Sequence, residues 1–407
     1  MSAVNQWPTH AANPDRKNTA LIVASLLSGN GKTGVEVHFN SILEAAQADG
    51  IATRLVTPYS STYWIQKGCN FLVNQLNRWQ PERAHRLLRF VHRRRLARHL
   101  RRALDDHSLH TITVYAQDPL SCAVALTLKE VIPFRLTTVA HFNISESLEF
   151  ASKGITAPGD SLWASLVHTE QTALPNVDRL IFVSHYMKRE ICRRIPALSS
   201  TRTCVLPNFT AASEDFVRTS LSRPHRVATI GSLEPRKNQA FLIKVIDACR
   251  KEGVDVVLDI MGDGPDRSKL ERLVHTLKLS DQVRFLGHVT NAAQRLPHYA
   301  LLLHAADMES FGIVIIEAMA AGVPVVAHPV GGIPEIITNE TNGLFWPSHD
   351  INDAATTLAE LLSDTSKRTA LSQAATKRFH QHFERNQMAP IWLNAITAQS
   401  LNEPTQT

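Results

Sequence analysis

The sequence predicts an α/β protein built from two doubly wound, Rossmann-like lobes that face each other across an interdomain cleft. Apolar, β-rich runs alternate with segments of helical periodicity along most of the chain, a pattern typical of parallel sheets covered on both faces. A length of 407 residues suits two domains. Hydrophobic residues make up 44% of the chain and charged residues 20%, which allows sizeable cores and excludes a mainly disordered chain.

The first half is expected to form one lobe. Its predicted strands cover residues 20–27, 51–56, 111–115, 136–140, 180–183 and 203–206. The predicted helices cover residues 34–48, 82–104, a segment starting at 120, and 186–194. A polar, serine-rich stretch at residues 209–224 marks the boundary to the next lobe.

The second half repeats the alternation without a short-period repeat. Its predicted strands cover residues 227–230, 256–261, 283–285, 301–304 and 323–327, with helices at 350–362, 367–383 and 390–398. We therefore expect a flexible tail at 1–18, a first Rossmann-like domain at 19–210 and a second at 211–385. Residues 386–407 would be a helix and tail packing back on the first lobe.

The composition of the chain indicates in which cellular compartment the protein is expected. The first 18 residues are polar, and no apolar stretch approaches the roughly 20 residues of a membrane span, so we expect neither signal nor span. The five cysteines are odd in number and widely separated, as for free thiols in a reducing cytoplasm. Up to Thr210 the chain carries 24 Lys/Arg against 15 Asp/Glu, so the excess positive charge lies in the first half.

The loop after the first strand, residues 28–34, has the sequence Ser-Gly-Asn-Gly-Lys-Thr-Gly. Gly31 and Gly34 would let the backbone approach a phosphate or sugar closely at a helix start. A P-loop is the alternative, but the position that should hold its first glycine is Leu26, inside the strand. A tight turn without a ligand is a third interpretation.

The densest group of candidate functional residues spans 307–324. A strand leads into a turn and then into a helix expected to begin near residue 310 or 311, so the N–H groups of Phe311, Gly312 and Ile313 would bind a phosphate. Glu309 lies at the mouth of the helix. Glu317 interrupts an otherwise apolar helix about 12 Å further along, at 1.5 Å per residue, where the two hydroxyls of a ribose would satisfy its carboxylate.

Two alternatives apply to these acidic residues. Glu317 could take part in a structural ion pair. Asp307 and Glu309, one carboxylate pair on a short turn, could form a DxD-like site for a divalent cation. We expect no metal and no cofactor.

The spacing of Glu309 and Glu317 resembles the EX7E region of the retaining nucleotide-sugar glycosyltransferases of family 4, which have the GT-B fold. Six further motifs follow in the family's order: VSHYMK at 183–188, LPN at 206–208, IGSLEPRKN at 230–238, MGDGP at 261–265, FLGHV at 285–289 and VGGIPE at 330–335. Together they extend the resemblance over most of the chain.

The resemblance implies a donor site in the second lobe. Glu309 would contact the donor sugar, Gly312 and Ile313 the pyrophosphate, and Glu317 the ribose. Lys237 would neutralise the leaving group, which agrees with the charge that develops on a departing nucleoside diphosphate.

Other contacts follow from the same resemblance. The base would lie near Val289. The family often has an arginine where this chain has Ser232, so Arg236 is the candidate second cation.

His141 follows the predicted strand at 136–140. A lone histidine at a strand end is more often a hydrogen-bonded core residue. The family, however, has a histidine after the corresponding strand, near the reacting sugar. The resemblance therefore implies that His141 orients the donor and stabilises developing positive charge, without acting as general base.

A predicted helix contains nine arginines, three histidines and no acidic residue between positions 83 and 102. Leu87, Val91, Leu96, Leu100 and Leu104 trace its expected apolar stripe. It is either a solvated helix packed on the sheet or a contact with an anionic membrane surface. Nucleic acid is not an expected partner, because no RNA- or DNA-binding motif accompanies the charge.

The resemblance thus predicts a cytoplasmic, retaining hexosyltransferase, peripheral on the inner membrane face if the arginine-rich helix binds lipid. Its donor would be a nucleotide diphosphate sugar, and its acceptor a saccharide or a lipid-linked molecule, in polysaccharide, lipopolysaccharide or glycolipid synthesis. The alternatives are a nucleotide-sugar epimerase or hydrolase of the same fold, and a non-catalytic nucleotide-sugar-binding subunit.

Overall fold

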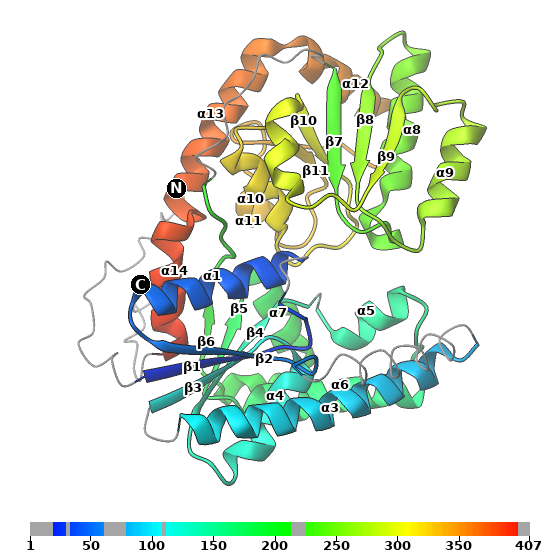
Figure 1. Cartoon of the computed structure of the whole chain (residues 1–407). Helices are drawn as coiled ribbons and strands as arrows, with labels where there is room; N and C mark the ends of the chain where they lie inside the picture. Colours follow the sequence, from blue (N-terminus) through cyan, green and yellow to red (C-terminus); the bar gives the residue numbers. More distant parts are fainter. Residues whose placement is uncertain are drawn as a thin grey trace.

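Two parallel six-stranded sheets, each flanked by helices, make up the molecule (Figure 1). The computed structural model describes residues 19–29, 33–60, 79–107, 111–142, 144–212 and 225–397. The first lobe, shown below in Figure 1, contains strands β1–β6, and the second lobe contains strands β7–β12. The predicted α/β class with two Rossmann-like lobes is confirmed.

The first lobe has strand order β2-β1-β3-β4-β5-β6. Its strands are β1 (Thr19–Ala24), β2 (Ala52–Val56), β3 (Thr111–Ala116), β4 (Arg135–Ala140), β5 (Arg179–Phe182) and β6 (Thr203–Val205). Its helices are α1 (Gly34–Ala48), α3 (Pro81–Asp106), α4 (Pro119–Lys129), α5 (Glu146–Ser152), α6 (Ser161–Ala173) and α7 (His185–Arg194). The chain leaves β1 toward β2 on one side and returns to β3 on the other, so the loops after β1 and β3 flank the switch point where such sheets bind ligands.

The second lobe has strand order β12-β11-β10-β7-β8-β9. Its strands are β7 (Arg226–Ile230), β8 (Val257–Met261), β9 (Val283–Gly287), β10 (Leu301–His304), β11 (Val325–Ala327) and β12 (Leu344–Phe345). Its helices are α8 (Gln239–Lys251), α9 (Arg267–Thr276), α10 (Ile313–Ala320), α11 (Ile333–Ile336), α12 (Ile351–Ser363) and α13 (Thr365–His382). Here the switch point lies between β7 and β10.

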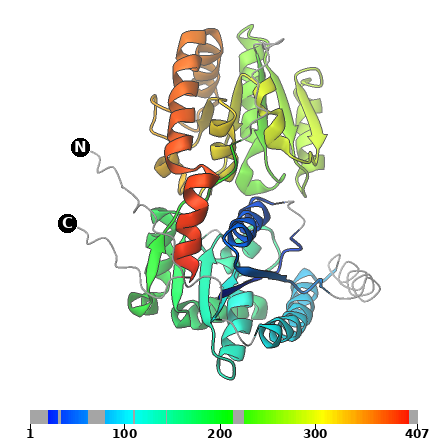
Figure 2. The same ribbon diagram turned by 60° about the vertical axis from the view of Figure 1, so that its left-hand side comes forward.

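The last described helix, α14 (Arg385–Thr397), crosses back and lies against α1 and β3 of the first lobe (Figures 1 and 2). The indole Nε1 of Trp392 donates to the Pro207 carbonyl at 2.9 Å. At the crossing, the Thr210 N–H donates to the Phe383 carbonyl at 3.1 Å, and the Arg385 N–H donates to the Thr210 carbonyl at 2.9 Å. The segment that leaves the first lobe at Thr210 and the segment that returns to it at residues 383–385 are therefore hydrogen-bonded to each other.

The apolar stripe of α3 differs from the predicted one. Leu96, Leu100 and Leu104 are buried as expected, but Leu87 is 40% exposed. Nine residues separate Leu87 from Leu96, and at 100° per residue this places Leu87 on the opposite side of the helix. His92 takes a buried position instead, four residues before Leu96.

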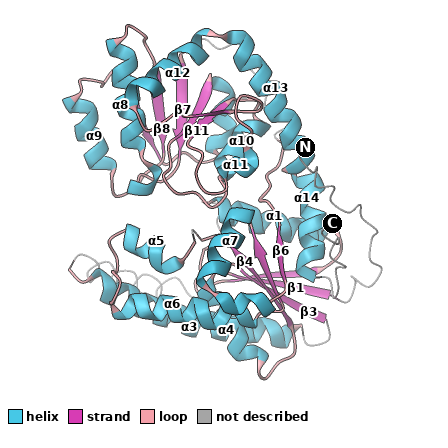
Figure 3. Ribbon diagram, turned by 180° about the vertical axis from the view of Figure 1, so that it is seen from behind, coloured by secondary structure: helices cyan, strands magenta, loops and turns pink. Residues whose placement is uncertain are grey.

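Three other features of the structure differ from the sequence-based expectations or were not among them. Helix α10 begins at Ile313 and not at residue 310 or 311, because Gly312 has a left-handed backbone with φ of 103°. Helix α5 lies where no helix was predicted, and Ser145 caps it by accepting the Ser147 N–H. The two-residue strand β12 was not predicted. Figure 3 shows α5 beside α6 from behind.

Some expectations concern residues outside the described part: the tails at 1–18 and 398–407, the loop glycine Gly31, and most of the boundary stretch. The four cysteines that the structure does describe form no disulfide bond with one another.

Candidate active site

A cavity of about 1500 Å³ lies between the lobes. It is lined by loops that follow β1, β3 and β4 in the first lobe and β7, β8, β9 and β10 in the second. Apart from Gly31, which lies outside the described residues, all the predicted site residues line it: Gly34, His141, Ser232, Arg236, Lys237, Val289, Glu309, Phe311, Gly312, Ile313 and Glu317. Motifs that are distant in sequence therefore meet at one place.

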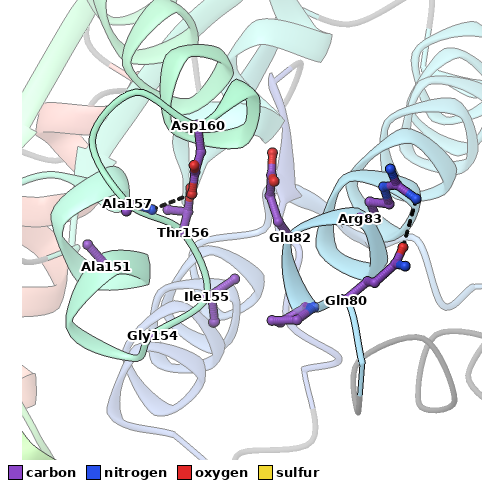
Figure 4. A pocket seen from close by; sticks show the side chains of 10 residues that line it. Gln80, Glu82, Arg83, Ala151, Gly154, Ile155, Thr156, Ala157 and Asp160 are labelled. Atoms are coloured by element: carbon purple, nitrogen blue, oxygen red, sulfur yellow. Dashed lines mark hydrogen bonds between the residues drawn. The ribbon is translucent and has the colours of Figure 1, made fainter.

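A second, smaller cavity lies at the edge of the first lobe, between the start of α3 and the loop joining α5 to α6 (Figure 4). Its acidic groups already have partners. Glu82 accepts from Ser161 Oγ at 2.8 Å and the Leu162 N–H at 3.1 Å, and Asp160 accepts from the Ala157 N–H at 2.6 Å. The interlobe cavity is the better candidate because polar atoms without partners line it.

Lys237 and Glu309 form the central ion pair of the second-lobe wall. Lys237 Nζ lies 2.5 Å from Glu309 Oε2, and their side chains are only 14% and 11% exposed. His304 Nε2 lies 3.5 Å from the same oxygen. Burial alone would raise the pKa of Glu309, but the Lys237 ammonium and His304 outweigh it and hold that pKa well below its usual range. Glu309 is thus a carboxylate with a fixed cation beside it.

The backbone around Glu309 is held by two glycines that follow β11. The Gly332 N–H donates to the Glu309 carbonyl at 3.0 Å. A Cβ on Gly331 would lie 1.8 Å from the same carbonyl oxygen, and its φ of +59° is left-handed. Only glycine permits this approach. The motif at 330–335 therefore positions Glu309.

The same motif also joins the lobes. The Glu335 carboxylate accepts the N–H groups of His185 and Tyr186 at 2.8 and 2.7 Å, at the N-terminus of α7. Ser184 Oγ donates to the Ser310 carbonyl at 2.8 Å. A carboxylate at a helix N-terminus is favourable because it binds unsatisfied N–H groups.

Ser232 and Arg236 lie beside the ion pair. Ser232 Oγ donates to Glu234 Oε1 at 3.1 Å, and Arg236 is paired with the same carboxylate at 2.7 Å. The Nε of Arg236 is buried without a hydrogen-bond partner among the described residues. Arg236 therefore retains a free donor in the cavity wall.

The start of α10 faces the cavity, with Gly312 as its N-cap and Glu317 further along the same wall. No hydrogen bond or ion pair joins the Glu317 carboxylate to another residue of the described chain, and burial raises the pKa of Glu317 to about 7. The structural ion pair considered for Glu317 is thus absent among the described residues.

The backbone of the loop after β1 already binds a carboxylate from α1. The Glu36 carboxylate accepts the N–H groups of Gly29 and Thr33 at 2.9 and 3.0 Å. These two N–H groups are not free for a phosphate, which weakens the P-loop alternative. Gly34 lies at the lobe interface, where a Cβ would be 2.7 Å from Ile313 Cδ1.

The first-lobe wall is polar and incompletely paired. His141 Nε2 is buried without a partner, and burial lowers the pKa of His141 to about 3, so its ring is neutral. Both polar atoms of Gln117 lack partners too. Glu146 is bound to Arg89 at 2.6 Å, but burial raises its pKa to about 7, and its Oε2 has no partner in the described chain.

Sequence reasoning missed Gln117, Glu146 and His304. Gln117 directly follows β3, His304 is the last residue of β10, and Glu146 is the first residue of α5. Polar residues at the carboxyl ends of parallel strands indicate a ligand site, and this signal could have identified Gln117 and His304. Of the two acidic residues of the DxD alternative, Glu309 is already paired with Lys237 at 2.5 Å, and Asp307 accepts from Asn238 Nδ2 at 3.1 Å.

These features define a two-lobed α/β protein with a charged interlobe site. Residues 32–214 match the family model described as Glycosyltransferase Family 4, and residues 213–378 match the one described as Glycosyl transferases group 1. The chain belongs to the family-4 type of GT-B glycosyltransferases.

Relatives of known name match part of the chain. N-acetyl-alpha-D-glucosaminyl L-malate synthase of Bacillus anthracis is 36% identical over 130 residues, covering 32% of this chain and 34% of that protein. The GDP-mannose-dependent alpha-(1-6)-phosphatidylinositol monomannoside mannosyltransferase of Mycobacterium tuberculosis is 34% identical over 179 residues, covering 41% and 46%. The chain therefore matches less than half the length of these relatives.

Solved structures agree over most of the chain. HepE of Anabaena, in complex with UDP and glucose, has a TM-score of 0.67 at 17% identity, covering 94% of this chain and 100% of its own. Sucrose-phosphate synthase of Thermosynechococcus elongatus has a TM-score of 0.69 at 19% identity, covering 92% and 97%. At such identities the likeness establishes the fold. No helix in the described ranges has the length and apolarity needed to cross a membrane.

Proposed function

We propose that this protein transfers a hexosyl unit from a nucleoside diphosphate sugar to a hydroxyl of a saccharide or lipid-linked acceptor, with retention at the anomeric carbon. The observation that carries the proposal is the buried Lys237–Glu309 pair beside the start of α10, in the wall of the interlobe cavity. The name of the Mycobacterium tuberculosis relative, a GDP-mannose-dependent mannosyltransferase, supports the same reaction class.

In the proposed reaction, the bond between the anomeric carbon and the diphosphate oxygen breaks while a bond to the acceptor oxygen forms on the same face. The acceptor proton passes to the departing diphosphate. Lys237 and the N–H groups of Gly312 and Ile313 stabilise the charge that develops there, with Arg236 as a second cation. Lys237 takes the place that a divalent metal would have, so we propose a metal-independent transfer without a cofactor.

The remaining roles follow from position. Glu309 binds the sugar hydroxyls, and Glu317 binds the ribose. Val289 lies against the base. His141, neutral and at the first-lobe wall, orients the sugar and stabilises positive charge at the anomeric carbon. Gln117 and Glu146 receive the acceptor hydroxyls, because both side-chain polar atoms of Gln117 and the Oε2 of Glu146 lack partners in the described chain.

A thermal-shift panel of UDP, GDP and ADP sugars tests the donor class. One base should raise Tm, since a ligand at 100 times its Kd stabilises by about 2.7 kcal/mol. The same effect should be lost in Lys237→Ala and kept in Lys244→Ala, an exposed lysine on α8. No shift with any donor would contradict the proposal.

Turnover then separates the alternatives. Release of nucleoside diphosphate only with added acceptor supports transfer. Sugar release with water alone would indicate a hydrolase, a changed sugar an epimerase, and binding without turnover of any acceptor a non-catalytic subunit.

We also propose that α3 attaches the protein to an anionic membrane surface from the cytoplasmic side. Phe90 is 53% exposed and Leu87 40%, beside exposed arginines such as Arg86 and Arg94. Apolar side chains among cations suit an interfacial helix. Co-sedimentation with phosphatidylglycerol vesicles should be salt-sensitive and weaker in Phe90→Ser. Equal recovery with neutral vesicles would contradict it.

A further inference from the structure

Three loops at the carboxyl edge of the second-lobe sheet bring together Asp307, His328 and His349. Asp307 follows β10, His328 follows β11, and His349 precedes α12. One ligand atom from each lies within 4.8 Å of the others. None of the three lines the interlobe cavity, so the cluster is separate from the donor site.

His328 is the buried member of this cluster, with 2% exposure. Its Nδ1 lies 3.1 Å from the Ala305 carbonyl. A carbonyl only accepts, so Nδ1 carries the proton and Nε2 carries the lone pair. This Nε2 is buried without a hydrogen-bond partner in the described chain, and an unpaired polar atom of this kind is costly. The ring of His349 lies 4.5 Å from the ring of His328.

Asp307 is oriented by its surroundings as well. Its Oδ1 accepts from Asn238 Nδ2 at 3.1 Å, and its own N–H donates to the Arg236 carbonyl at 2.9 Å. No lysine or arginine of the described chain forms an ion pair with this exposed carboxylate, which leaves it available to a cation. Bonds that fix the far side of a histidine and of a carboxylate are what metal ligands characteristically have.

We propose that Asp307, His328 and His349 form a binding site for a transition-metal ion of the zinc class. Two imidazoles and one carboxylate suit Zn²⁺ better than Mg²⁺ or Ca²⁺, which prefer oxygen ligands. At metal–ligand distances of about 2.0–2.2 Å the donor atoms must close to about 3.5 Å. The exposed side chains of Asp307 and His349 supply this movement and leave a fourth position open to solvent.

The ion would act as a brace. It would join the loop after β10, which carries Glu309 two residues beyond Asp307, to the loop after β11, which carries Gly331. No step of the transfer reaction passes through it.

Titration of the full-length chain with Co²⁺, after dialysis against a chelator, tests the site by its visible absorption, and Zn²⁺ competition then gives the affinity. We expect wild type to bind one equivalent that His349→Ala and Asp307→Asn bind at least about tenfold more weakly. Both changes are at exposed positions, and circular dichroism checks their fold. The matched control is His275→Ala, an exposed histidine on α9, which should bind like wild type.

Equal uptake by wild type and His349→Ala, or no uptake by wild type, would overturn the proposal. The titration contains no sugar donor or acceptor. Its outcome is therefore independent of whether the protein is a glycosyltransferase.

Discussion

The two walls of the interlobe cavity differ in how their polar groups are satisfied. In the second lobe, Lys237 pairs with Glu309 at 2.5 Å and Arg236 with Glu234 at 2.7 Å. In the first lobe, the side chain of Gln117 and one ring nitrogen of His141 are buried without partners in the described chain. The difference indicates that the Lys237–Glu309 and Arg236–Glu234 pairs are held in place before a ligand binds, whereas Gln117 and His141 would gain their missing hydrogen bonds from a ligand.

Of the variants that test this contrast, Lys237→Ala should cause the largest loss of activity. Removing the cation leaves the buried Glu309 carboxylate without its ion-pair partner Lys237 and removes the proposed counter-charge for the departing diphosphate. We expect kcat to fall by about 10²–10³-fold. Steady-state kinetics beside Lys244→Ala measures it, and a loss confined to KM would contradict a role in the transition state.

His141→Ala should come next. The ring lies on the first-lobe wall, so turnover should fall roughly a hundredfold while the Kd for the nucleoside diphosphate stays nearly unchanged. Isothermal titration with the diphosphate and a rate assay separate the two quantities. Turnover near the wild-type level would remove His141 from the proposed mechanism.

Gly331→Ala tests how tightly the Glu309 loop is held. The left-handed backbone costs about 1–2 kcal/mol for alanine, and the clash with the Glu309 carbonyl adds about 1–3 kcal/mol. Gly253→Ala is the matched control, because its φ is +82° but nothing lies within 4 Å of the added Cβ. Urea unfolding should show a greater loss for Gly331→Ala; equal losses would mean that the close approach is unimportant.

Gln117→Leu addresses the opposite wall. An apolar side chain of similar size removes buried unpaired polar atoms, so the free energy of unfolding should stay level or rise. The acceptor KM should rise about tenfold and the donor KM should not change. A clear loss of stability would show that Gln117 has a structural role, and an unchanged acceptor KM would place the acceptor elsewhere.

Glu317→Gln should give the smallest effect, visible as a pH dependence. Burial raises the pKa of Glu317 to about 7 from an ordinary value of 4.5, so the folded chain retains a proton that the unfolded chain has released. The stability from this group is present below pH 4.5 and is lost as the pH rises through 7. Relative to wild type, the variant should therefore gain stability between pH 5 and 8 in urea titrations. Parallel curves would contradict the raised pKa.

Local patterns in the sequence predicted much of this arrangement. The predicted helix at 34–48 has the bounds of α1, and the strand at 301–304 has the bounds of β10, because each follows from the spacing of apolar residues and from flanking caps. Helix α5 could have been found from Ser145 and the acidic residues in its first turn.

Contacts between distant segments were beyond such patterns. Lys237 and Glu309 are 72 residues apart, and nothing in either motif states that they pair. The approach of Gly34 to Ile313 depends on how the two lobes meet. The two-residue strand β12 is too short for any periodicity to indicate it.

The doubled crossing of the chain determines how the cavity can open. Because Thr210 is hydrogen-bonded to Phe383 and Arg385, any swing of one half against the other must flex both connections together. Two parallel chain segments that are hydrogen-bonded to each other can bend together about one axis, but they resist sliding and twisting. The two lobes should therefore open by a hinge motion about this crossing, and substrates should enter the cavity from the side opposite the hinge.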